Sequence, residues 1–171
     1  MKYQLAAATA GIAYAVSGAA VIGHQVPDSN WGTRGALVDV AGAVAFAATA
    51  IALTRLTPML AGGRTAAWAS RIAQIGLAAM TIESIASLVH GGNTLGPVFF
   101  LGLLLALGGT AALGYAGVRA RRLTWAAPLP LLALLVAIAG GDRGGFVAAG
   151  IVWLVLAAAP MRASRLTRAA A

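Results

Sequence analysis

The chain has 171 residues, of which 60% are hydrophobic and only 9% are charged, and its mean hydropathy is +0.87. Soluble domains have about 25% charged residues, so this composition is too poor in charge to cover a surface in water. The net charge is +8, but the arginines are spread over short loops, which excludes a soluble nucleic-acid-binding domain. Cysteine is absent, which excludes disulfides, thiolate metal sites and cysteine nucleophiles. We therefore predict an all-α, polytopic membrane protein.

Six hydrophobic segments follow one another along the chain, and we predict that they form six transmembrane helices of a single domain, residues 1–171. They cover residues 5–23, 36–54, 72–89, 98–118, 123–139 and 146–160. A span needs roughly 20 apolar residues to cross about 30 Å of hydrocarbon, and the first four segments meet that length. The last two are shorter and are joined by a tight glycine-rich turn. A re-entrant pair covered by protein is the alternative for these two, and we favour two full spans.

The first segment has a second interpretation. Met1 and Lys2 precede an apolar run that reaches small residues at 17–20, a pattern that also resembles a weak signal peptide. The single lysine and the length of the apolar run favour a retained helix. Its cleavage would leave the remaining spans and their orientation unchanged.

The basic residues predict the orientation of the chain, because ten of the twelve fall on one side of the membrane that the six predicted helices cross. These ten are Lys2, Arg55, Arg64, Arg71, Arg119, Arg121, Arg122, Arg162, Arg165 and Arg168. Short loops rich in Lys and Arg stay cytoplasmic, so both termini are expected in the cytoplasm and the protein in the cell inner (plasma) membrane. Arg119, Arg121 and Arg122 are expected to meet anionic headgroups of membrane lipids, the first expected partners.

Small residues are unusually frequent in the segments, with Gly at 22 positions. Helices in lipid associate through close backbone approach at small side chains, so residues such as Gly109 and Gly114 predict packing grooves within the bundle. A ligand groove is one alternative. Another is a seam that docks a second copy of the chain or a partner membrane protein.

The third segment carries most of the polar residues predicted to lie within the membrane: Gln74, Thr81, Glu83, Ser84, Ser87 and His90. Spacing of three and four residues puts Glu83, Ser87 and His90 on one stripe of a helix. Glu83 then lies about 10 Å from His90 along the axis. An acid at that depth costs about 2.5–3.5 kcal/mol, so Glu83 is expected to face the interior and to have a polar partner.

The first two segments offer residues at a matching depth. Tyr14 and His24 share a side of the first helix, and Asp39 enters the second near the same level. The predicted site is an outer-facing polar cavity formed by Tyr14, His24, Asp39, Glu83, Ser87 and His90. The alternative is that the histidines are interfacial residues and Glu83 is a structural hydrogen-bonding group.

Four chemistries compete for such a cavity. Glu83 as a protonatable centre predicts binding or transport of a small ligand or ion. His24 and His90, the only two histidines, could ligate a haem iron from equal depth. The same histidines with Asp39 or Glu83 could hold a divalent metal. Catalytic motifs are missing from the sequence, so an enzyme is not favoured, and an intramembrane hydrolase remains only as a further alternative.

The stretch Arg119-Ala120-Arg121-Arg122-Leu123-Thr124-Trp125-Ala126-Ala127-Pro128 resembles the inner loop of small multi-pass membrane proteins of actinobacteria. The resemblance extends over roughly residues 96–165, with a glycine-rich helix before the loop and an arginine-ended helix after it. It implies a six-helix membrane fold without an assigned activity, and no functional residue is carried over from it. The second class of function, a structural or regulatory membrane subunit that docks a partner protein, therefore stays open.

Overall fold

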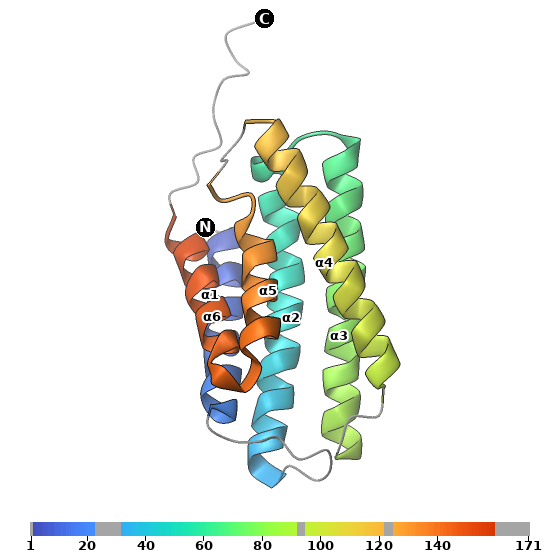
Figure 1. The fold of residues 1–171 in the computed structure, drawn as a ribbon, viewed down its shortest axis with the longest axis vertical. Helices are drawn as coiled ribbons and strands as arrows, with labels where there is room; N and C mark the ends of the chain where they lie inside the picture. Colours follow the sequence, from blue (N-terminus) through green and yellow to red (C-terminus); the bar gives the residue numbers. More distant parts are fainter. Residues whose placement is uncertain (1, 23–31, 92–94, 122–124, 160–171) are drawn as a thin grey trace, which may run out of the picture.

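A computed structural model describes residues 2–22, 32–91, 95–121 and 125–159. These residues form an all-helical bundle (Figure 1). The elements are α1 (Lys2–Val21), α2 (Gly32–Leu60), α3 (Arg64–His90), α4 (Gly96–Arg119), α5 (Leu129–Gly140), the short 3-10 helix η1 (Gly141–Arg143) and α6 (Gly145–Ala158). Four of them, α1 to α4, are long and apolar enough to cross a membrane, and α5 and α6 are shorter apolar helices.

The helices pack in the circuit α4–α3–α2–α1–α6–α5. The circuit is almost closed, because α5 approaches α4 mainly through the turn that precedes α5. At that point Gly114 and Gly117 of α4 face the backbone and side chain of Ala127. Figure 1 shows that α2, α3 and α4 extend further than α1, α5 and α6 at the end where α1 begins.

Two helices are longer than the hydrophobic segments that predict them. The second segment ends at residue 54, but α2 continues through Arg55 and Pro58 to Leu60, and α3 begins at Arg64 instead of residue 72. Arginine marks the edge of the apolar region and does not end a helix. Pro58 lies in the last turn of α2, where its missing N–H removes only one backbone hydrogen bond. The chain reverses instead at Gly63, whose φ of 96° favours glycine.

The buried core of the bundle is rich in small residues, and many large apolar side chains are exposed on its outside. Alanine dominates the buried core, with Ala45, Ala73 and Ala149 fully buried. In contrast, Ile51 is 58% exposed and Phe100 is 61% exposed. Large side chains on the outside would be unfavourable in water, and they are compatible with a bundle surrounded by lipid. The fold is therefore that of an apolar helical bundle compatible with an integral membrane protein.

Glycines allow the closest helix contacts, between α3 and α4 and between α1 and α6. A Cβ added at Gly109 of α4 would collide with the backbone of Ala73 in α3. Gly102, about two turns earlier on the same face, lies against Gly76, and an added Cβ would be 2.7 Å from its carbonyl oxygen. Such approaches increase van der Waals contact between helices in lipid. The packing interpretation of Gly109 thus agrees with the structure.

Helix α6 follows α1 from one end to the other. At one end the Tyr3 hydroxyl donates a hydrogen bond of 2.9 Å to the carbonyl oxygen of Ala159. At the other end Ile22 lies beside Gly144, 3.8 Å from the position of an added Cβ. The hairpin formed by α5, η1 and α6 therefore reaches the levels at which α1 begins and ends.

Candidate functional site

The polar face of α3 is directed into the bundle. Glu83, Ser84 and Ser87 are each only 6% exposed. The Ser87 hydroxyl donates a hydrogen bond of 2.8 Å to Oε1 of Glu83, as expected for residues four apart on one helix face. Glu83 is therefore an acid held inside the bundle with a hydroxyl partner on its own helix.

Asp39 of α2 is the second acid at this level. It is half-buried, and its carboxyl lies close enough to Glu83 for the two groups to interact electrostatically. The neighbouring turn fixes the register of the two helices, since a Cβ added at Gly42 would lie 3.6 Å from the Oγ of Ser84. Two of the four acidic residues of the chain thus lie at neighbouring levels of adjacent helices, beside the contact of Gly42 with Ser84.

Tyr14 lies at a different depth of the bundle from Asp39. Its ring packs edge-on against Phe46, with centroids 6.0 Å apart, and stacks on Phe146 at 6.3 Å. Phe46 follows Asp39 by seven residues, or about 10 Å along α2. The structure therefore brings Asp39, Glu83 and Ser87 together and places Tyr14 in a separate aromatic layer.

Phe99 of α4 extends that aromatic layer, 6.2 Å from the ring of Phe46. The layer runs from α6 through α1 and α2 to α4, across the middle of the circuit. Sequence reasoning missed it, because the three phenylalanines lie on different helices and no spacing along the chain connects them.

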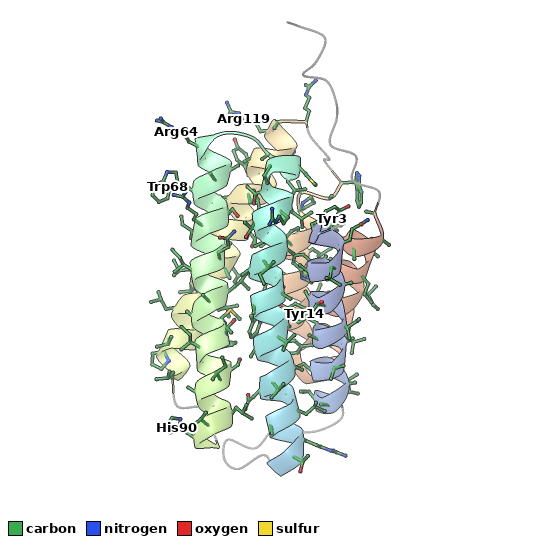
Figure 2. The ribbon with its side chains drawn as sticks, turned by 180° about the vertical axis from the view of Figure 1, so that it is seen from behind. Tyr3, Tyr14, Arg64, Trp68, His90 and Arg119 are labelled. Atoms are coloured by element: carbon green, nitrogen blue, oxygen red, sulfur yellow. The ribbon has the colours of Figure 1, made fainter. Side chains whose placement is uncertain are left out.

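The histidines do not join the acid pair among the described residues. His90 is exposed, and its Nδ1 lies 2.9 Å from the carbonyl oxygen of Ala86 on its own helix. Figure 2 shows His90 at the end of α3 opposite Arg64 and Trp68. His24 lies outside the described residues. Within residues 2–22, 32–91, 95–121 and 125–159, no group of three or more His, Cys, Asp or Glu side chains is placed to hold a metal ion.

Cationic and aromatic side chains lie together at the other end of the bundle. Arg119 and Arg121 are exposed, and the Arg119 guanidinium approaches the Tyr115 hydroxyl at 3.4 Å. The Arg71 guanidinium lies 5.6 Å from the ring centroid of Trp68. Trp and Tyr beside arginine are typical of a membrane–water interface. Arg122, the third predicted headgroup ligand, falls outside the described residues.

A polar network near the same end joins α2 to α3, and sequence reasoning missed it. Ser70 accepts hydrogen bonds from the Thr57 hydroxyl at 2.7 Å and from Nε2 of Gln74 at 3.0 Å. Gln74 also donates to the Thr54 hydroxyl at 3.2 Å. The usable signal is that polar residues recur three or four apart on both helices that flank one turn. The network ties the α2–α3 hairpin together.

Comparison with protein-family models, with curated proteins and with solved structures gives no match for this chain. The functional argument therefore depends on the geometry of the bundle.

Proposed function

We propose that the protein is an integral protein of the plasma membrane with six spans and both termini in the cytoplasm. Helix α1 has 20 residues, or about 30 Å, which matches the hydrocarbon thickness. The α5–α6 hairpin follows α1 between the Tyr3–Ala159 hydrogen bond and the Ile22–Gly144 contact. This common extent supports the proposal that α5 and α6 cross the same hydrocarbon layer as α1. The excess of arginine at the end that carries Arg64 and Arg119 (Figure 2) supports a cytoplasmic location of that end.

We further propose that this protein takes up a proton or another small cation at the acid pair Asp39–Glu83. The observation that carries this function is that Asp39 and Glu83 lie at neighbouring levels of α2 and α3, beside the Gly42–Ser84 contact, where their charges interact. Two neighbouring carboxylates repel each other in a medium of low dielectric, and a shared proton or a bound cation removes that repulsion. Acids within membrane helices commonly mark ion and proton pathways.

We expect the proton or cation to reach the acid pair Asp39–Glu83 from the outer side of the membrane. Glu83 lies seven residues, or about 10 Å, from the His90 end of α3, and Asp39 lies seven residues after the start of α2. Towards the cytoplasmic end the next residues on the interior face of α3 are Met80 and Leu77, which are buried. Half-buried Asp39 is the outer group in this arrangement and Glu83 the inner one.

Thermal unfolding of the purified protein in detergent tests the acid pair. The unfolding temperature is measured over a pH series and over Na⁺, K⁺, Ca²⁺ and Mg²⁺ series. A cation that binds only the folded state at 100 times its Kd stabilises the protein by about 2.7 kcal/mol. We expect the wild type to respond, and Glu83→Gln and Asp39→Asn to lose the response while remaining folded.

Two serines provide a matched control for this test. Ser87→Ala removes the hydrogen bond to Glu83 and should change the midpoint of the response. Ser84→Ala removes an equally buried hydroxyl from the next position on the same face and should leave the midpoint unchanged. Identical responses of the wild type and Glu83→Gln would refute the proposed cation site.

A second candidate function is a membrane subunit that docks another protein through α4. One observation favours it: Gly108 is exposed with no atom within 4 Å of an added Cβ, and Ala111 and Ala112 beside it are also exposed. Small residues at a lipid-facing surface permit close approach of a further helix. Gly108→Leu should then lower the oligomeric mass in detergent, or release the bound partner, without loss of folding.

A further inference from the structure

Three fully buried polar side chains in the middle of the bundle lack a hydrogen-bond partner in the described residues. They are Tyr14 on α1 and Thr49 on α2, each 1% exposed, and Trp153 on α6, 0% exposed. The atoms concerned are the two hydroxyl oxygens and the indole Nε1. Buried polar groups in native proteins are almost always hydrogen-bonded, so three such atoms on neighbouring helices require an explanation.

The three side chains lie at one depth. The hydroxyl of Thr49 is the polar neighbour of the Tyr14 hydroxyl, although the two are not in hydrogen-bonding geometry. The packing of α1 on α6 gives the level of Trp153. A Cβ added at Gly150 would lie 2.6 Å from the carbonyl oxygen of Gly11, and one at Gly11 would lie 2.8 Å from Cγ of Leu154. Trp153 thus sits on α6 opposite the turn of α1 that ends at Tyr14.

The direction of Trp153 follows from its neighbour. Leu154 is 38% exposed, whereas Trp153 is fully buried. The indole is therefore on the interior side of the α1–α6 contact, the same side as the ring of Tyr14, which packs against Phe46 of α2. Helices α1, α2 and α6 each direct one unpaired polar atom towards the inside of the circuit.

We propose that Tyr14, Thr49 and Trp153 form an internal hydration site, occupied by one or a few water molecules at the middle of the bundle. The indole N–H can only donate, whereas the two hydroxyls can donate and accept. Water satisfies this mixed set, because a buried water molecule makes two to four hydrogen bonds to otherwise unsatisfied polar groups. The surrounding walls are aromatic and apolar, and the nearest acid along α2, Asp39, is ten residues or about 15 Å away. On α3, Glu83 precedes Ser84, which faces Gly42, seven residues or about 10 Å before Thr49 along α2, so neither acid lies at the depth of the three polar atoms.

This site is independent of the acid pair. Thr49 lies between Asp39 and Thr57 along α2, about 15 Å from one and about 12 Å from the other. Water at Tyr14, Thr49 and Trp153 would place hydrogen-bonding groups at three depths of the bundle: the acid pair, the hydration site and the Thr57–Ser70–Gln74 network.

Magnetisation transfer from water to the indole protons tests the hydration site. The chain has four tryptophans, so ¹⁵N-indole labelling gives four signals, and Trp153→Phe assigns the one of interest. We expect a water cross-peak at the Trp153 indole of the folded protein in detergent micelles. Tyr14→Phe and Thr49→Val should each weaken the cross-peak, because they remove a hydroxyl that holds the water and keep the shape of the side chain.

Tyr115→Phe is the matched control, since Tyr115 is 67% exposed on α4 and its loss should leave the cross-peak unchanged. The proposal is overturned if the Trp153 indole shows no transfer from water and exchanges as slowly as the amides of its own helix. It is also overturned if Tyr14→Phe and Thr49→Val raise the unfolding temperature and leave the cross-peak unchanged, because the two hydroxyls would then be unpaired in a dry core.

Discussion

Ser70 joins α2 to α3 at the end of the bundle that carries Arg64, because its oxygen accepts hydrogen bonds from both Thr57 and Gln74. Ser70→Ala leaves Nε2 of Gln74 and the hydroxyl of Thr57 with fewer partners. Hydrogen bonds between membrane helices contribute about 0.6 kcal/mol on average and up to about 1.7 kcal/mol. We expect a loss of stability in this range, measured by reversible unfolding in mixed micelles.

Thr81→Val is the control for that substitution. The Thr81 hydroxyl binds only the carbonyl oxygen of Leu77 on its own helix, at 2.8 Å, so its removal should cost less. Equal losses for Ser70→Ala and Thr81→Val would mean that the network does not join the helices.

The acid pair and the position of Tyr14 show how far sequence reasoning reaches at this scale. Spacing along one helix predicted that Glu83 and Ser87 share a face. The orientation of the spans predicted that Asp39 enters the second helix near the level of His24 and His90, in one outer-facing cavity with Glu83. Tyr14 could not be placed in this way, because its neighbours depend on the rotation and tilt of α1 against α2. Those are set by Gly11 and Gly18 packing on α6, a contact between distant segments.

At the scale of the element, α4 provides a test within two adjacent residues. Gly109 faces the backbone of α3, whereas a side chain at Gly108 would meet open space. Gly109→Leu should destabilise the bundle by at least about 1–3 kcal/mol, the usual cost of overpacking. Gly108→Leu should leave the unfolding transition of the monomer unchanged.

Unfolding in detergent and the yield of folded protein measure both variants. Comparable destabilisation by the two substitutions would mean that the face of α4 that bears Gly108 is also covered. That result would contradict the proposal that a partner docks on the small-residue surface of α4.

Helix ends were the least predictable feature of the elements. The second hydrophobic segment ends at residue 54, yet α2 runs to Leu60, because the end of an apolar segment and the end of a helix are separate features of a chain. The long α2 and α3 carry the Thr57–Ser70 hydrogen bond close to this edge. Polar residues can pair there at little cost in desolvation.

For the whole molecule, the absence of cysteine makes the proposed topology directly measurable. Single cysteines replace Ser29, Asn93 or Ser164, and intact cells are treated with a membrane-impermeant thiol reagent. We expect labelling at positions 29 and 93 and none at 164, because short arginine-rich loops stay on the cytoplasmic side of a membrane. Labelling at 164 in intact cells, or protection at 29 and 93 that persists after cell lysis, would contradict the orientation or the six-span arrangement.

The class of the fold was predictable from composition and from the period of apolar segments, whereas the circuit of helices was not. The composition alone indicates whether the surface of the chain suits water or lipid. This inference does not depend on which helices pack against each other. The contact of α6 with α1 joins segments far apart in the sequence, and it depends on shape complementarity at glycine faces and on the Tyr3–Ala159 hydrogen bond.

That pairing has a consequence for the order of events during synthesis. Helix α1 leaves the ribosome before α6, and among the described residues it is α6 that covers the glycine face carrying Gly11 and Gly18. At about 5–20 residues per second, the nascent chain waits roughly 6–25 s between the two. During this interval α1 can pack only on α2, and the face meant for α6 remains available to lipid or to insertion factors. We therefore expect the contact of α1 with α6 to form late, after both helices have been synthesised.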